Sequence, residues 1–251
     1  MSADYAVLAP IYLATGMAEF SEAMTPRLID FAQRHDWMGR RILDLGCGPG
    51  ASLEWLTRRN YIAIGVDQSA AMLELCRQRL EDSGLYHDLR EQDVRDLSDD
   101  LGAMDLVLAL DMVNELNSLR DLEALFNSVH RVLNEKRLFI FDLHTIQGLT
   151  RAGSAGDQII RDSASLTVVA SNGYDFDRQV HERRYLIFHH ENGSWQRSEA
   201  VRVLRGYPVQ AVAALLQRCG FQIQHVVTPT FDDFEPGISR ADRILFLAEK
   251  Q

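Results

Sequence analysis

The apolar residues of this chain follow two different spacings along the sequence. Between residues 41 and 145, short runs of consecutive apolar residues alternate with segments in which they recur every three or four positions. Consecutive runs are typical of strands buried on both faces, and the longer spacing is typical of helices with one inward face. The alternation predicts an α/β fold in which helices cover a mostly parallel sheet.

Five apolar runs are expected to form parallel strands, and two later runs an antiparallel pair that completes the sheet. The seven strands are predicted at Arg41 to Leu45, Tyr61 to Asp67, His87 to Gln92, Met104 to Leu110, Arg137 to Leu143, Phe221 to Val227 and Ile244 to Ala248. Helices are expected after the first, second and fourth strands, and another begins near Pro208.

After residue 145 the apolar spacing becomes two, which is typical of strands with one buried face. The alternating runs are separated by Asn172-Gly173 and Asn192-Gly193, and this dipeptide favours tight hairpins. The pattern predicts an inserted antiparallel sheet over about residues 160–206, preceded by a loop at 148–156. If Asn192-Gly193 form the turn, Glu191 pairs with Ser194 and Val180 with Arg205.

The expected domain organisation follows from these changes of spacing. Residues 1–40 are predicted to form an N-terminal helical cap, 41–145 and 207–251 the α/β core, and 146–206 an inserted antiparallel β lid.

The stretch RILDLGCGPG at 41–50 is a buried strand that runs into a glycine-rich turn and then into a helix. Glycines let the backbone turn tightly and let a ligand lie close to it. The helix start adds unpaired N–H groups and a partial positive charge. Gly46, Gly48, Ala51 and Asp67 also satisfy the dinucleotide pattern, so an NAD-dependent dehydrogenase stays open at this point.

The sequence D-L-G-C-G-P-G, which begins at Asp44, closely resembles the first motif of class I S-adenosylmethionine-dependent methyltransferases, of the small-molecule, sugar N-methyltransferase-like group. The resemblance implies a doubly wound, Rossmann-like fold and S-adenosylmethionine as the cofactor. Asp67 ends the second strand, where an acid binds ribose hydroxyls in open α/β sheets. Met72 is also explained as a core residue of its helix. The implied cofactor-binding residues are Asp44, Gly46, Gly48, Gly50, Asp67, Gln68, Met72, Asp93, Val94 and Leu110.

Three residues are candidates for catalysis. The run A-L-D-M-V-N-E-L resembles the stretch after the fourth strand of sugar N-methyltransferases, which implies that Asn114 lies near the transferred methyl group. His144 follows the fifth strand, where a histidine can serve as a base or be purely structural. Tyr12 and Tyr5 either face the active site, as the resemblance implies, or are core aromatic residues. Glu115 is interpreted as a solvated acid at a helix start.

The substrate side is expected in the inserted sheet. Glu199, Arg205 and Tyr207 match a pattern of the same group, E-x-x-H-x-x-R-x-Y, although Arg202 stands where histidine is usual. The predicted register places Arg184, Arg197, Glu199 and Arg205 on one face. That face either closes the cleft over an anionic part of the substrate or is a solvated surface of compensating charges.

Composition narrows the function further. A formal net charge of −10 argues against nucleic acid and favours a small-molecule substrate. Three separated cysteines suggest neither a zinc site nor a disulfide framework, and no other metal cluster is visible. The N-terminal apolar run is too short to span a membrane, so a cytoplasmic monomer or homodimer is expected.

The sequence therefore predicts a methyltransferase that acts on a small molecule, with an amine nitrogen favoured over oxygen or carbon. Two alternatives are the dehydrogenase and a non-catalytic module that only binds S-adenosylmethionine.

Overall fold

The computed structural model describes residues 4–191 and 193–251, so the predicted role of Asn192 at a turn lies outside the described residues. Its centre is a seven-stranded sheet in the order β10-β11-β5-β4-β1-β2-β3. The strands are β1 (Arg41–Leu45), β2 (Ile62–Asp67), β3 (Leu89–Glu91), β4 (Met104–Ala109), β5 (Leu133–His144), β10 (Phe221–Val227) and β11 (Arg243–Lys250). The predicted seven strands and the closing antiparallel pair are confirmed.

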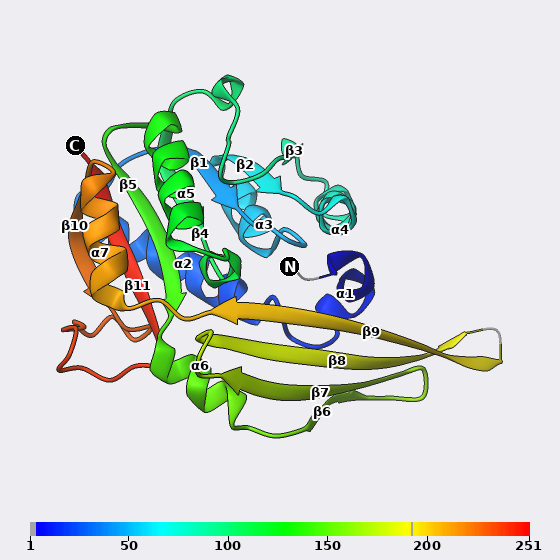
Figure 1. The fold of residues 1–251 in the computed structure, drawn as a ribbon. Helices are drawn as coiled ribbons and strands as arrows, with labels where there is room; N and C mark the ends of the chain where they lie inside the picture. Colours follow the sequence, from blue (N-terminus) through cyan, green and yellow to red (C-terminus); the bar gives the residue numbers. More distant parts are fainter. Residues whose placement is uncertain (1–3, 192) are drawn as a thin grey trace.

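Helices cover both faces of this sheet, as the apolar spacing predicts. The core helices are α3 (Ala51–Arg58), α4 (Ala70–Asp82), α5 (Leu119–Val132) and α7 (Val209–Arg218), with short 3-10 turns η1 (Asp99–Leu101) and η2 (Val113–Glu115). In Figure 1, α5 and α7 lie in front of the sheet, whereas α2 (Glu19–Arg34) lies behind it. Phe126 and Leu216 pack on the front face, and Leu28 and Leu56 pack on the other.

The register of the parallel strands brings their carboxyl ends to one edge. Leu45 of β1 pairs with Val66 of β2 on one side and with Ala109 of β4 on the other. The segments that leave these three strands therefore begin side by side, which is where open α/β sheets bind ligands.

A second, four-stranded antiparallel sheet follows β5. Helix α6 (Ile146–Gly153) leads into β6 (Gln158–Asp162), β7 (Leu166–Asp175), β8 (Val180–Glu191) and β9 (Ser194–Arg205), which pair in that order. The predicted register between β8 and β9 is confirmed, because Glu191 pairs with Ser194 and Val180 with Arg205.

Two local predictions in this region are wrong. Asn172 and Gly173 are not a turn but lie inside β7, where Gly173 pairs with Glu182 of β8. The chain turns over residues 176–179 instead, with Gln179 in the left-handed region at φ 53°. The predicted loop at 148–156 is mostly helix α6, whose first turn is capped by the Thr145 hydroxyl.

Helix α1 (Tyr5–Tyr12) lies between the two sheets. Its residues Leu8 and Ile11 pack against Tyr185 and Ala200 of the antiparallel sheet. The other side of the helix, including Tyr12, packs against the start of α3 and against α4. This helix therefore joins the antiparallel sheet to the edge of the core where the parallel strands end, as Figure 1 shows. Among the described residues, no helix is long and apolar enough to cross a membrane.

Candidate functional site

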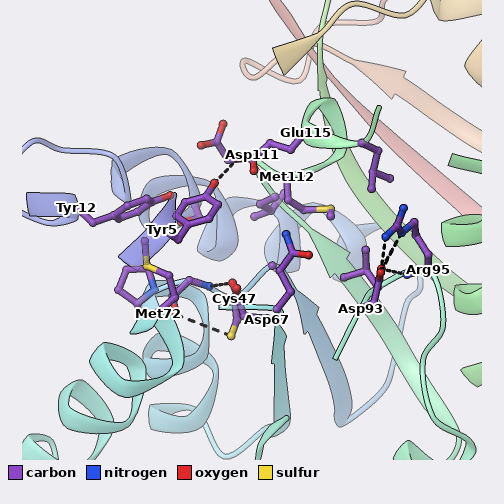
Figure 2. Close-up of a pocket in the computed structure, with 18 of the residues that line it drawn as sticks. Tyr5, Tyr12, Cys47, Asp67, Met72, Asp93, Arg95, Asp111, Met112 and Glu115 are labelled. Atoms are coloured by element: carbon purple, nitrogen blue, oxygen red, sulfur yellow. Dashed lines mark hydrogen bonds and ion pairs between the residues drawn. The ribbon is translucent and has the colours of Figure 1, made fainter. Parts of the chain in front are cut away.

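A cavity of about 320 Å³ opens at the carboxyl ends of β1, β2 and β4. Its wall is formed by the turns that leave the strands and by helix α1. In Figure 2, Tyr5 and Tyr12 stand on one side, opposite Asp93 and Arg95. The lining residues are Tyr5, Tyr12, Ser21, Gly46, Cys47, Gly48, Pro49, Asp67, Gln68, Met72, Asp93, Val94, Arg95, Leu110, Asp111, Met112, Glu115, Leu116 and Asn117.

The glycine-rich turn forms the base of the cavity. Gly48 has φ 51°, and a Cβ placed on it would meet no heavy atom nearer than 4.0 Å. Its backbone is therefore bare toward the cavity. Gly50 is different, because a Cβ there would collide with the Cys76 sulfur of α4. Gly50 is not in the cavity wall, and this close packing explains why position 50 needs a glycine; its contact with the cofactor stays a prediction.

Asp67 stands beside this turn at the end of β2. One of its carboxylate oxygens accepts the Gly48 N–H and the other the Ser69 N–H, each at 2.9 Å. Burial raises the pKa of Asp67, against these hydrogen bonds. Each carboxylate oxygen has a second lone pair, so Asp67 can still accept ligand hydroxyls.

Asp44 lies beneath the turn rather than in the cavity wall, and its side chain is almost fully buried. Its Oδ2 has no hydrogen-bond partner within the described residues. Burial, with a smaller contribution from Asp67, raises the pKa of Asp44 to about 8. The cofactor-binding role of Asp44 stays a prediction, since its buried carboxyl lies outside the cavity wall.

The far side of the cavity follows β3. Asp93 pairs with Arg95 through its Oδ2 at 2.6 Å, and Arg95 also reaches Asp121 at 3.0 Å. Hydrogen bonds from Arg95 lower the pKa of Asp93. Val94, Gln68 and Leu110 also line the cavity, as does Met72, which lies beside Tyr12 on the opposite side in Figure 2.

The wall after β4 is acidic. Glu115 accepts hydrogen bonds from the Tyr5 hydroxyl and from Arg202 Nε, the latter at 2.7 Å. Arg202 comes from β9 and also pairs with Asp111 Oδ2 at 3.0 Å. The interpretation of Glu115 as a solvated acid is wrong, because only 14% of its side chain is exposed and Arg202 pairs with it.

Asp111 is held by several groups at once. Its backbone is in the left-handed region at φ 58°, and its N–H donates to Asp142 at 2.6 Å. Arg243 pairs with both carboxylates. Burial disfavours the charged form of Asp111, but Arg202 and Arg243 outweigh burial and hold its pKa far below the usual range. The arginines stabilise a backbone conformation that is costly for a residue with a Cβ.

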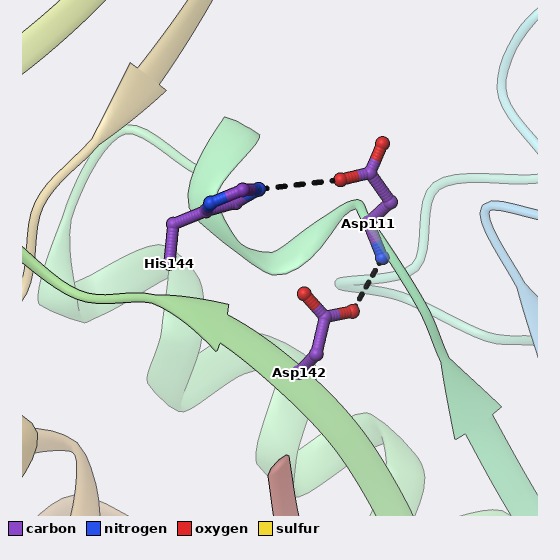
Figure 3. A group of neighbouring side chains, drawn as sticks. All are labelled: Asp111, Asp142 and His144. Atoms are coloured by element: carbon purple, nitrogen blue, oxygen red, sulfur yellow. Dashed lines mark hydrogen bonds and ion pairs between the residues drawn. The ribbon is translucent and has the colours of Figure 1, made fainter. Parts of the chain in front are cut away.

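Asp111, Asp142 and His144 stand close enough to offer metal ligands, as Figure 3 shows. Both carboxylates already pair with Arg243, which supplies the positive charge that a cation would supply. The chemistry of this group is that of a buried ion-pair cluster.

Three predicted site residues lie behind the wall. The Asn114 amide donates to the backbone oxygens of His144 at 3.0 Å and Arg205 at 2.8 Å. The His144 ring meets Asp111 Oδ1 at 3.4 Å, and the Tyr207 hydroxyl donates to the Leu116 backbone at 2.5 Å. Each of Asn114, His144 and Tyr207 is therefore engaged with protein atoms and none lines the cavity, so their direct roles stay predictions.

The face of the antiparallel sheet that carries Glu199 and Arg205 agrees with the second alternative, a solvated surface of compensating charges. Glu199 pairs with Arg184 and Arg197 on the outer face, and Arg205 donates to the Arg178 backbone. The opposite face meets α1 and the cavity wall, and it presents Arg202. Period-two spacing identifies residues that share a face, but charged residues occur on both faces of β9.

Sequence reasoning assigned no site role to Arg95, Arg202 or Arg243. One signal for Arg202 was available, since it shares its face of β9 with the buried residues Ala200 and Leu204. Arg95 and Arg243 gave no comparable local signal.

Comparison with known proteins places these features in a family. Residues 42–136 match the family described as "Methyltransferase domain". The curated protein "Putative methyltransferase YqeM" of Bacillus subtilis is 30% identical over 84% of this chain and 84% of its own length. A "Ubiquinone biosynthesis O-methyltransferase" of Actinobacillus pleuropneumoniae is 23% identical over 61% of this chain and 78% of its own length.

Solved structures share the fold. An S-adenosylmethionine-dependent methyltransferase from Clostridium acetobutylicum superposes with a TM-score of 0.79, at 21% identity over 90% of each chain. The sugar N-methyltransferase KedS8 of a Streptoalloteichus species superposes with a TM-score of 0.75, at 19% identity over 91% of this chain and 87% of its own. With its cavity at the glycine-rich edge of this fold and a relative that matches most of its length, the chain belongs to the S-adenosylmethionine-dependent methyltransferases.

Proposed function

We propose that this methyltransferase transfers the methyl group of S-adenosylmethionine to the nitrogen of a small-molecule amine. The observation that carries the proposal is the chemistry of the acceptor side, where Glu115 after β4 contacts Tyr5 of α1 and Tyr12 lines the same cavity. Within the described residues, no histidine lines the cavity. Relatives include an enzyme named for an oxygen acceptor, and a structure of the same fold is named for a sugar nitrogen. The cavity chemistry is therefore the argument that favours nitrogen.

The reaction requires a lone pair on the acceptor. The acceptor lone pair forms a bond to the methyl carbon while the carbon–sulfur bond breaks and its electron pair goes to sulfur. An amine then becomes an N-methylammonium, which loses a proton to water, and S-adenosylhomocysteine leaves. Because the sulfonium is already activated, the protein mainly aligns the reactants and excludes water.

A hydroxyl acceptor would need a base at the same place. The His144 ring faces Asp111 instead of the cavity. Burial raises the pKa values of Tyr5 and Tyr12, so neither phenol is readily deprotonated. An amine makes no such demand, because its neutral form carries the lone pair.

The cofactor is proposed to lie over the glycine-rich turn. Asp67 accepts the ribose hydroxyls, Asp93 and the Val94 N–H meet the adenine, and Gly46 and Gly48 leave room for the methionine part. The remaining acceptor positions of Asp67, which lines the cavity, and the open space above Gly48 support this placement. Four carboxylates and one arginine line the cavity, which suits a cationic sulfonium better than the diphosphate of a dinucleotide.

The helical cap of residues 1–40 and the lid of 146–206 are proposed to shape the acceptor side. Tyr5 of the cap and Arg202 of the lid both contact Glu115 in the wall, and these contacts support the proposal.

Two measurements test this function in sequence. Calorimetry should detect binding of S-adenosylmethionine and S-adenosylhomocysteine, but not of NAD. Methyl-labelled S-adenosylmethionine is then incubated with amines and with the corresponding alcohols and phenols. Label should appear on nitrogen, and a product labelled only on oxygen would refute the amine assignment.

A further inference from the structure

We infer that Glu115 is the residue that binds the acceptor, with its Oε2 receiving an N–H of the substrate amine. Tyr5 and Arg202 act as positioning residues that hold this carboxylate in place. The inference rests on the proposed amine acceptor and specifies the atom that recognises it.

The first step is the unequal use of the two Glu115 oxygens. Within the described residues Glu115 accepts two hydrogen bonds, from the Tyr5 hydroxyl and from Arg202 Nε, and both go to Oε1. Within residues 4–191 and 193–251, Oε2 accepts no hydrogen bond. A carboxylate has about four acceptor positions, so the side chain retains capacity for a ligand. It belongs to the cavity wall, where a ligand can reach it.

Asp111, the neighbouring acid of the same wall, has fewer acceptor positions left than Glu115. Arg243 and His144 meet its Oδ1, and Arg202 meets its Oδ2. Both Asp111 oxygens are therefore engaged with the protein, and of the two acids after β4 it is Glu115 that has an oxygen with no protein partner among the described residues.

The charge around Glu115 favours a cation. Among the described residues Arg202 is the cation that pairs with Glu115, and the same guanidinium also pairs with Asp111. One positive charge shared by two carboxylates does not neutralise both, so the potential at Glu115 Oε2 stays negative. A protonated amine satisfies both the hydrogen bond and the charge, whereas an alcohol satisfies only the hydrogen bond. The bound ammonium then loses one proton to water, and the neutral amine that results has the lone pair that attacks the methyl carbon.

The orientation of Glu115 is set by three parts of the chain. Glu115 ends η2, Tyr5 begins α1, and Arg202 lies on β9, where it is 8% exposed. Because both partners bind Oε1, they leave the carboxylate with one oxygen engaged and the other available. A carboxylate fixed in this way loses little entropy when the amine binds.

The test uses matched probes on the protein loaded with S-adenosylhomocysteine. The pairs are glucosamine with glucose, cyclohexylamine with cyclohexanol, and putrescine with 1,4-butanediol, and calorimetry gives each dissociation constant. We expect at least one amine to bind about tenfold or more tightly than its alcohol. Glu115→Gln should remove that preference while it leaves the S-adenosylhomocysteine affinity within about twofold.

Glu199→Gln is the matched control, because Glu199 lies on the outer face of the antiparallel sheet. It should retain the amine preference. No amine preference in the wild-type protein, or a preference that survives in Glu115→Gln, would overturn the inference. An equal loss of S-adenosylhomocysteine affinity in Glu115→Gln would also overturn it, because Glu115 would then support the cofactor or the fold.

The positioning role has a separate readout. Arg202→Met should weaken amine binding because it removes the group that holds Glu115. Arg202→Lys retains a charge but cannot contact Glu115 and Asp111 with one planar group, so its amine affinity should lie between those of Arg202→Met and the wild type. Amine preference can be measured without turnover. Methylation of oxygen in the labelled assay would therefore refute the proposed function, whereas equal binding of amines and alcohols would refute the role of Glu115.

Discussion

Replacement of Asp67 by alanine should weaken cofactor binding and also destabilise the cofactor-free protein. The sequence alone suggests a residue that serves only the ribose, with an intact fold after its removal. The structure adds a second role, because the carboxylate accepts the N–H groups of Gly48 and Ser69. Its loss leaves both donors of the turn without this partner.

The magnitude follows from these contacts. A hydrogen bond to a charged group contributes about 1.5–3 kcal/mol, and screening is small because Asp67 is 8% exposed. We expect Asp67→Ala to lower the free energy of unfolding by about that amount or more. The loss of the ribose contacts should raise the dissociation constant of S-adenosylmethionine by about tenfold or more.

Urea denaturation without cofactor measures the first effect, and calorimetry at a temperature where the variant is folded measures the second. Asp93→Ala is the comparison, since the Asp93 side chain is 41% exposed and its removal should change stability by less than about 1 kcal/mol. An Asp67→Ala protein with unchanged stability would refute the support role. An unchanged dissociation constant would refute the ribose role.

Three further outcomes are expected. Gly48→Ala should abolish cofactor binding and lower stability by about 1–2 kcal/mol. Gly84→Ala, at φ 64° with no neighbour within 4 Å, should lower stability through the same backbone strain but leave cofactor binding unchanged. Equal cofactor affinities of the two variants would contradict this. The pKa of Asp44 is raised to about 8 in the folded protein, so the folded state binds this proton more tightly than the unfolded state does. Asp44 therefore makes the free energy of unfolding fall as the pH rises from about 4 to 8. Asp44→Asn should reduce that fall when denaturation is measured across this range, and an identical slope in both proteins would count against it. Arg243→Met should cost about 3–5 kcal/mol by leaving its two buried carboxylates without this partner, while the exposed Arg184→Met should change stability by less than about 1 kcal/mol, and similar losses in both would argue against the ion-pair cluster.

The sequence by itself determined the order of strands and helices and the place of the glycine-rich turn. These depend on local rules: a buried strand needs consecutive apolar residues, and a tight turn needs glycine. The same holds for the β8–β9 register, because one short hairpin connection sets every later pair. The cofactor class was also readable, since Asp44 to Gly50 is a continuous motif.

Only the tertiary structure decided which side chains form the acceptor side. Period-two spacing groups Glu199 with Arg205 but does not say which face of the sheet turns inward, and helix α1 decides this by packing Leu8 and Ile11 on the opposite face. Glu115 has the local appearance of a surface acid because its partner Arg202 is 87 residues away in sequence. Charge pairing and burial are properties of groups that meet through the fold, so the roles of these residues depend on contacts that no local pattern contains.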